Sequence, residues 1–285
     1  MKRLTSFLKK VMKVASKPEM RILPGQLAFF FFLSIIPLVA LIGAIVSSFS
    51  IPVMELQKYT SLVLPPSISD FILSIKSYTT LNFNIIIFFI TAFILASNVT
   101  HSMIITSNEL YKIEPQKYMK RRIKAIGMLV VLLGVLIFLM LVPVYGDSIL
   151  DLLKKYSNNP QLMNLLHNIY TIIKYPLSIV VIYLSIKLLY VMAPDKKIKP
   201  RTTTRGAIFT TISWIISTEI YTFYINKFAI YDLFYGSISN VIVLLLWIYI
   251  LSYLFVLGIA LNVTSTKSKD ALATEEHKLD LDKGK

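Results

Sequence analysis

The amino-acid sequence predicts an all-α, polytopic membrane protein with six transmembrane helices, and three observations support this fold class. First, 55% of the 285 residues are hydrophobic and 16% are charged, which is too apolar for an ordinary soluble domain. Second, the segments 22–54, 77–108, 125–146 and 233–266 contain no Asp, Glu, Lys or Arg. Third, these and two further apolar stretches reach the roughly 20 residues that a helix needs to cross about 30 Å of hydrocarbon.

The predicted spans must be helices, because the bilayer core holds no water that could satisfy exposed backbone groups. Pro37 removes one backbone donor and predicts a kink in the first span. Gly127 and Gly134 lie one heptad apart and predict close packing of the third span. The six spans are placed at about 25–49, 83–107, 125–146, 175–193, 206–226 and 238–262.

The basic residues predict the orientation of the chain. Of its 30 Lys and Arg residues, 23 lie before the first span, in the second and fourth gaps between spans, or after the last span. Short loops rich in Lys and Arg stay in the cytoplasm, so both termini are expected there. The net charge of +15 is assigned to this topology and to attraction of lipid headgroups rather than to nucleic-acid binding.

The chain divides into three predicted regions. In residues 1–21 the apolar residues fall on one face of a helix and the Lys residues on the opposite face, which predicts a basic amphipathic helix in the membrane interface. A topogenic basic leader that happens to be amphipathic is the alternative. Residues 22–264 form the six-helix domain, and the polar segment 265–285 is expected to be a disordered cytoplasmic tail. The periodic gaps 50–76 and 147–174 predict short helices on the outer surface.

The motifs of common enzymes are absent from the sequence. It has no cysteine and three His residues, so neither a thiol site nor a His-rich metal site is predicted. It also lacks a Gly-rich phosphate loop, His-Glu-x-x-His and Gly-x-Ser-x-Gly. A nuclease would need carboxylates gathered on an aqueous face, and the loop acids are scattered. We therefore expect no enzyme activity, no cofactor and no bound metal.

Two polar stripes within the spans form a candidate polar pathway. Glu219 lies about thirteen residues into the fifth span, and acidic residues at membrane depth are functional candidates by default. A protonated Glu219 bonded to a neighbouring helix is an equal alternative, and an interface role is the alternative for His101. Lys187 lies at a different depth from Glu219, which disfavours an ion pair. The pathway comprises Glu219, Thr211, Thr222 and Asn226 in span five and Asn98, His101 and Ser102 in span two.

Basic residues of the two cytoplasmic loops form a candidate headgroup-binding surface. Each cation near an anionic membrane surface contributes about 1 kcal/mol of attraction. Membrane lipids, most of all anionic ones, are therefore the expected partners; nucleic acid is not expected, and a homo-oligomer is left open. The candidate residues are Lys120, Arg121, Arg122, Arg201 and Arg205.

Several short motifs occur in a fixed order between residues 20 and 265. They begin with Gln26–Leu27–Ala28 and Leu33–Ser34–Ile35–Ile36–Pro37, and end with Leu257–Gly258–Ile259–Ala260–Leu261–Asn262. Each motif alone is weak, but the ordered set resembles the YihY/BrkB family of bacterial inner-membrane proteins, formerly labelled ribonuclease BN. The motif positions are Pro37, Asn108, Tyr111, Pro194, Gly206, Tyr235, Gly236, Trp247, Gly258 and Asn262.

The resemblance implies a six-helix protein of the bacterial cytoplasmic (inner) membrane with a role in the cell envelope. It implies no catalytic residues, and the ribonuclease label is regarded as mistaken for the family. Our leading hypothesis is a transporter or an exporter of a lipid or other amphiphile. The alternative is a structural or accessory membrane protein that moves nothing, and a membrane ribonuclease is the least favoured reading.

Overall fold

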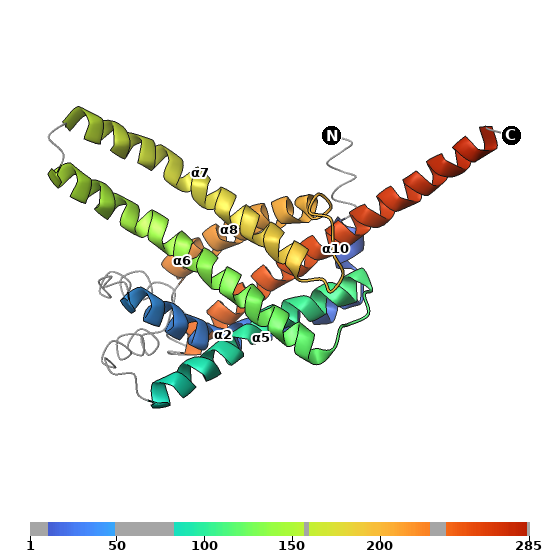
Figure 1. Ribbon diagram of the computed structural model, residues 1–285, viewed down its shortest axis with the longest axis horizontal. Coiled ribbons are helices and arrows are strands. Elements are labelled where there is room, and N and C mark those ends of the chain that lie inside the picture. Colours follow the sequence, from blue (N-terminus) through green and yellow to red (C-terminus); the bar gives the residue numbers. More distant parts are fainter. Residues whose placement is uncertain (1–10, 49–82, 157–159, 229–237, 284–285) are drawn as a thin grey trace.

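The computed structural model describes residues 11–48, 83–156, 160–228 and 238–283 (Figure 1). Within these ranges the chain is entirely helical with connecting loops, which confirms the all-α prediction. The outer helices predicted between 50 and 76, and the motif residues Tyr235 and Gly236, lie outside the described residues. The helices are α2 (Glu19–Ser48), α5 (Phe83–Tyr111), α6 (Tyr118–Tyr156), α7 (Pro160–Met192), α8 (Thr204–Phe228) and α10 (Ile238–Lys283).

These helices follow the order of the six predicted spans, one helix to each span. Among the described residues, three segments are long and apolar enough to cross a membrane, namely Glu19–Leu38, Phe89–Tyr111 and Val241–Thr264. A shorter apolar helix covers Pro176–Met192. The chain is therefore a membrane protein by length and composition of its helices, while the count of six spans stays a prediction.

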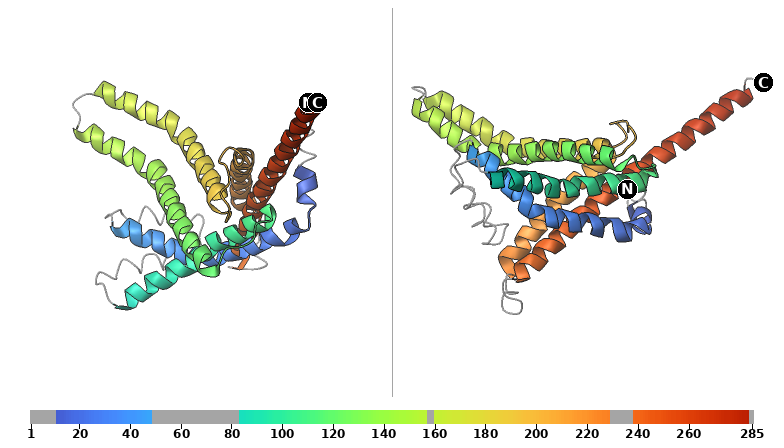
Figure 2. Two further views of the ribbon diagram at one scale, coloured as in Figure 1. Left: turned by 45° about the vertical axis from the view of Figure 1, so that its right-hand side comes forward. Right: turned by 60° about the horizontal axis from the view of Figure 1, so that its bottom comes forward.

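The third and fourth spans continue into longer helices than predicted. Residues 147–156 belong to α6 and residues 160–174 to α7, so these pieces are not separate outer helices. Pro176 lies inside α7 without ending it, which membrane helices tolerate. With 39 residues, α6 is about 58 Å long and exceeds the roughly 40–45 Å of a bilayer with its headgroups. Figures 1 and 2 show the joined ends of α6 and α7 projecting together away from the other helices.

The C-terminal tail also differs from its prediction. The last helix, α10, continues to Lys283, so residues 265–283 are helical where disorder was expected. Ala271, Leu272 and Ala273 are strong helix formers, and adding residues to an existing helix avoids the cost of nucleation. Gly284 follows directly, as is common after a helix end. The final part of α10 extends away from the other helices in all views (Figure 2).

The described end of the predicted interfacial helix packs against the protein. Residues 11–15 are helical, and α2 begins after Pro18. Val14 is 1% exposed and Met20 is 2% exposed, and both join the main hydrophobic core. Met12 and Lys13 are exposed on the other side. Part of the apolar face of this segment therefore contacts protein, and the interfacial helix over residues 1–21 stays a prediction.

The core lies where α2, α5, α6, α7, α8 and α10 meet. Its largest fully buried side chains include Tyr190, Phe255, Leu27 and Ile104. The outward side of α8, by contrast, exposes apolar residues such as Ile212 and Ile216. Such faces are expected in lipid, where an apolar side chain gains nothing from contact with protein rather than acyl chains.

The glycines of the third span do not serve close packing. A Cβ atom added at Gly127 or Gly134 would meet no atom within 4 Å, and both residues are exposed. The prediction from their spacing is therefore wrong. Close backbone approach occurs instead between α8 and α10, where Gly206 and Gly258 face each other.

Candidate functional site: the polar end of the helix bundle

Buried polar side chains gather on the C-terminal half of α5. Six of them are at most 4% exposed: Ser97, Thr100, Ser102, Thr106, Ser107 and Asn108. A buried hydroxyl without a hydrogen bond costs roughly 1–3 kcal/mol. Thr100 is satisfied, because its Oγ1 donates to the carbonyl oxygen of Ala125 on α6 at 2.7 Å.

Other polar atoms on this part of α5 lack hydrogen-bond partners. Ser102 Oγ, Thr106 Oγ1 and Ser107 Oγ are buried without one, as are His101 Nε2 and Tyr111 OH. Native proteins satisfy nearly all buried polar groups, so each exception calls for a water, an ion or a ligand. Within the described part of the chain, α5 holds most of these exceptions. Of the polar stripe predicted for the second span, His101 and Ser102 thus carry buried atoms without a partner.

The stripe meets basic residues at the start of α6. The Arg122 guanidinium donates to Asn98 Oδ1 and to the Ile94 carbonyl oxygen, each at 2.8 Å. The His101 ring meets the Tyr118 ring edge to face, with centroids 5.9 Å apart. The structure therefore joins Asn98, one of the predicted pathway residues of α5, to the predicted headgroup residue Arg122.

The stripe predicted for the fifth span is divided between the inside and the outside of the protein. Thr211 is buried, and its hydroxyl donates to the Ala207 carbonyl oxygen at 2.8 Å. Glu219 and Thr222 are exposed, and Thr222 donates to the Thr218 carbonyl oxygen at 2.9 Å. The side chain of Asn226 lies outside the described ones. The structure does not bring Glu219 to the α5 stripe.

The charge of Lys187 has a partner other than Glu219. Its ammonium nitrogen lies 5.7 Å from the centre of the Tyr183 ring on the same helix, a cation–π contact. No ion pair joins Lys187 to Glu219 in the described part of the chain.

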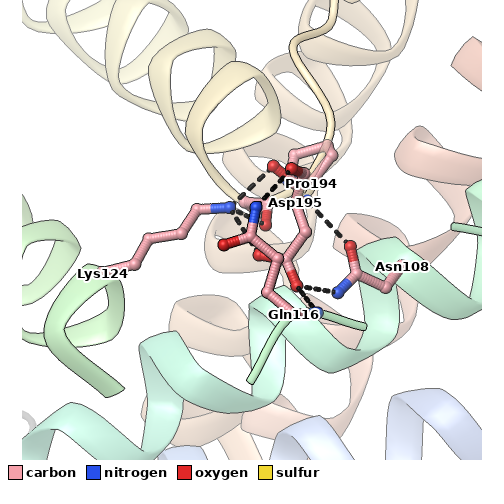
Figure 3. A network of polar contacts seen from close by, with 6 residues as sticks. Asn108, Gln116, Lys124, Pro194 and Asp195 are labelled. Carbon is pink, nitrogen blue, oxygen red and sulfur yellow. Dashed lines mark hydrogen bonds and ion pairs between the residues drawn. The ribbon is translucent and has the colours of Figure 1, made fainter. Parts of the chain in front are cut away.

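A buried carboxylate, Asp195, joins the loop that follows α7 to the end of α5 and the loop that follows it (Figure 3). Asp195 Oδ2 accepts hydrogen bonds from Asn108 Nδ2 at 2.7 Å and from the Gln116 backbone N at 3.1 Å. Asn108 Oδ1 in turn accepts from the Asp195 backbone N at 2.8 Å. We call Asn108, Gln116, Lys124 and Asp195 the loop latch.

Lys124 completes the loop latch from α6. Its Nζ lies 3.0 Å from Asp195 Oδ1 and also donates to the carbonyl oxygens of Ala193 at 2.9 Å and Pro194 at 2.6 Å, just beyond the end of α7. The Asp195 side chain is 1% exposed. Burial opposes its charge, but the hydrogen bonds from Gln116, Lys124 and Asn108 outweigh it and hold the pKa of Asp195 below its usual value.

The end of α5 carries a strained cap that contacts α2. Lys112 has a φ of 56°, and Ile113 N donates to the Asn108 carbonyl oxygen at 2.9 Å, which is the pattern of a Schellman cap. Glycine usually occupies this position, because a Cβ there costs about 1–2 kcal/mol. The Lys112 ammonium forms ion pairs with Glu109 at 2.9 Å and with Glu19 of α2 at 3.3 Å.

The C-terminal motif positions form one packing contact between α8 and α10. Gly206 N donates to Asn262 Oδ1 at 2.7 Å. A Cβ at Gly258 would contact Tyr190 OH and Thr210 Oγ1, which hydrogen-bond each other at 2.7 Å. The Tyr190 hydroxyl also donates to the Phe255 carbonyl oxygen at 2.8 Å. These positions hold the helices together rather than line a path.

Other motif positions are likewise part of helix contacts. Pro37 is buried in α2, and one turn earlier Ser34 Oγ donates to the Leu95 carbonyl oxygen of α5 at 3.2 Å. The Trp247 ring stacks on Tyr221 with centroids 5.0 Å apart, and its Nε1 is buried without a partner.

The remaining headgroup candidates lie at the surface. Lys120, Arg201 and Arg205 are exposed, whereas Arg121 is half-buried and its Nε is buried without a partner. No group of three His, Asp or Glu side chains among the described residues could hold a metal ion.

The sequence reasoning missed Asp195, Lys124 and Gln116. The available signal was that Asp195 is the only acid among five basic residues in the fourth gap. A lone acid at such a place, directly after Pro194, can indicate a structural ion pair.

Together, these features define an α-helical membrane protein whose polar contacts gather at one end of the bundle. The chain belongs to the family described as virulence factor BrkB, whose pattern matches residues 11–281. This membership confirms the resemblance seen in the sequence motifs.

The chain is also similar to relatives with other names. The chain is 28% identical over 268 residues to the putative ribonuclease-like protein YfkH of Bacillus subtilis, covering 93% of this chain and 96% of that protein. It is 35% identical to a UPF0761 membrane protein of Alteromonas mediterranea, over 26% of this chain and 25% of that protein. For a UPF0761 membrane protein of Haemophilus influenzae the identity is 37%, over 25% and 26%. No solved structure matches the chain.

Proposed function

We propose that this membrane protein of the bacterial cell envelope moves a lipid or another amphiphile that carries an anionic headgroup. The observation that supports the proposal is the row of buried, unpartnered polar atoms on α5, which ends beside basic side chains at the start of α6. A permanently packed core would be more stable with apolar residues there, because each unsatisfied hydroxyl costs free energy.

The proposed path keeps each part of an amphiphile in a suitable medium. The headgroup follows the polar residues of α5, of which Ser102 and Thr106 lie one helical turn apart. The acyl chains stay in the bilayer, against exposed apolar faces such as that of α8. We place the protein in the cytoplasmic membrane with both termini inside, because the Lys and Arg residues of its loops favour that orientation.

The test removes a buried hydroxyl without removing a contact. Ser102→Ala should slow the movement of labelled phosphatidylglycerol between leaflets of reconstituted liposomes by about tenfold, while leaving the protein as stable or more stable. Thr91→Val is the matched control on α5, because Thr91 is exposed and its hydroxyl donates only to its own helix. Movement no faster than in protein-free liposomes, across several lipids, would overturn the proposal.

A second candidate is a structural or accessory role without transport. It is favoured by the motif residues, since Gly206, Gly258 and Asn262 serve helix packing and Asn108 serves the loop latch. Under this role Ser102→Ala would preserve cellular function at normal protein levels. A loss of function with normal levels would instead favour transport.

We do not propose ribonuclease activity, although the relative from Bacillus subtilis is named ribonuclease-like. Three described carboxylates, Glu19, Glu109 and Asp195, form ion pairs with lysines. None belongs to a cluster that could hold a metal. RNA cleavage by the purified protein, abolished by one point substitution, would contradict this view.

A further inference from the structure

Four polar groups meet at the junction of α5 and α6. Asn98 and His101 lie one turn apart on α5, and Tyr118 and Arg122 lie one turn apart on α6. Arg122 is tied to Asn98, and the His101 ring is packed on Tyr118. Arg121 is the neighbour of Arg122 and places its Nε in the protein interior.

Two groups at this junction lack a hydrogen-bond partner. Arg121 Nε carries a proton and has no acceptor, and His101 Nε2 has neither donor nor acceptor opposite it. A buried guanidinium donor is among the most costly groups to leave unpaired, because it belongs to a charged side chain.

The positive charge at the junction is not neutralised. Among the described residues, the acids that form ion pairs contact Lys112 or Lys124 and neither arginine. The partners of Arg122 are a side-chain amide and a backbone carbonyl, both neutral. Arg121 lies one helical turn before Ala125, whose carbonyl oxygen accepts the hydrogen bond from Thr100 of α5.

The position of these cations is unfavourable for the helix itself. Lys120, Arg121 and Arg122 fall within the first five residues of α6, where the helix dipole favours anions. Orientation in the membrane requires positive charge in the loop, but it requires neither this place in the helix nor burial of Arg121 Nε. A bound anion would relieve both costs.

We propose that His101, Arg121 and Arg122 bind a phosphate group, either the headgroup of a membrane phospholipid or free phosphate. Arg121 Nε–H and the Nε2–H form of His101 donate to phosphate oxygens, and Arg122, held by Asn98, supplies the second positive charge. Arginine suits this task because its planar donors match the geometry of phosphate oxygens. The inference rests on the proposed function, since it names the substrate class of that path.

The experiment measures binding to the full-length protein in neutral detergent, without any transport step. Native mass spectrometry follows titrations with short-chain phosphatidylglycerol, with diacylglycerol of the same chain length, and with inorganic phosphate. Arg121→Gln should weaken phosphatidylglycerol binding about tenfold or more. Lys117→Gln, which removes the same charge from an exposed position four residues earlier, should weaken it less than about threefold.

Two further variants separate recognition from folding. Arg121→Lys keeps the charge but loses the Nε donor, so it should bind less well than the native protein although its thermal stability stays similar. His101→Phe keeps a ring against Tyr118 and removes both ring nitrogens, and it should also weaken binding.

The outcomes are distinct. Binding of phosphatidylglycerol that inorganic phosphate displaces only at much higher concentration identifies the lipid headgroup as the ligand, and tighter binding of inorganic phosphate than of phosphatidylglycerol identifies free phosphate. Equal binding of diacylglycerol, or equal losses in Arg121→Gln and Lys117→Gln, overturns the site. If Arg121→Gln loses binding but liposomes with the native protein show no lipid movement, the phosphate site stands and the proposed transport fails. If the native protein moves lipid but does not bind phosphatidylglycerol at this site, the proposed transport stands and the phosphate site fails.

Discussion

At the scale of single residues, the contact between α8 and α10 depends on a missing side chain at Gly258. The hydroxyls of Tyr190 and Thr210 occupy the space that a Cβ would need, and they are already hydrogen-bonded to each other. Neither can move away without leaving a buried polar group unpaired. Gly258 is therefore required by packing, and its occurrence in the family motif has a structural reason.

We predict that Gly258→Ala lowers the free energy of unfolding by about 1–3 kcal/mol, the usual cost of overpacking a core. Thermal unfolding of the purified protein in detergent measures the change. Gly134→Ala is the control, because it adds the same methyl group in open space and should be neutral or stabilising by helix propensity. Equal destabilisation of the two variants would contradict the assigned contact.

Residue types could be predicted from the sequence more readily than their partners. Asn98, His101 and Arg122 were each singled out as polar or basic candidates, and the structure joins Asn98 to Arg122. Glu219 was singled out by the cost of its charge, yet it lies on the exposed side of α8. Helical spacing places residues on one face of a helix, but it does not say which face meets the neighbouring helix.

At the scale of elements, the apolar runs located the helices but not their ends. Hydrocarbon thickness determines the length of an apolar run, whereas caps and turns determine where a helix stops. The cap of α5 uses Lys112 in place of glycine, so its sequence carries no Gly signal. α6, α7 and α10 also extend beyond their apolar runs, so the length of an apolar run does not determine where these helices end.

The loop latch joins two elements that are distant in sequence, and a double-mutant cycle can measure it. Asn108→Ala and Asp195→Ala should each reduce the free energy of unfolding by about 1–3 kcal/mol, because each leaves charged or polar partners unpaired. The double variant should lose clearly less than the sum, since the two residues share one network. Glu114→Ala, at an exposed position of the same connection, should be neutral. Additive losses would show that the network is not one unit.

The loop latch also predicts a pH dependence. The pKa of Asp195 is lowered in the folded protein, so its contribution is fully present above the usual pKa of an aspartate and is lost as the pH falls through the lowered value. The melting temperature of the native protein should therefore exceed that of Asp195→Asn by a constant amount from about pH 8 to pH 5. The difference should shrink below about pH 4. A difference that grows on acidification would have the wrong sign for this mechanism.

At the scale of the whole molecule, the orientation can be tested directly because the chain has no native cysteine. Single substitutions Lys197→Cys in the loop after α7 and Asn164→Cys near the start of α7 place thiols on opposite sides of the predicted membrane. A membrane-impermeant maleimide applied to intact cells should label Asn164→Cys and leave Lys197→Cys unlabelled until the cells are opened. Labelling of Lys197→Cys in intact cells would reverse the predicted orientation.

The fold class was predictable because the bilayer alone determines the apolar composition of the spans and the length of each apolar run. The candidate site was predictable only in part, since Lys124 and Asp195 are 71 residues apart and their pairing arises from how the helices pack.

The length of the α6–α7 hairpin has a practical consequence for imaging. A protein of 32.5 kDa that is largely covered by a detergent micelle offers little contrast or alignment signal to an electron microscope. α6 alone is longer than a bilayer is thick, so a rigid soluble domain inserted between Tyr156 and Pro160 would be attached to two antiparallel helices. Such a fusion would supply a visible landmark without disturbing the polar end of the bundle, which lies at the other ends of these helices (Figure 1).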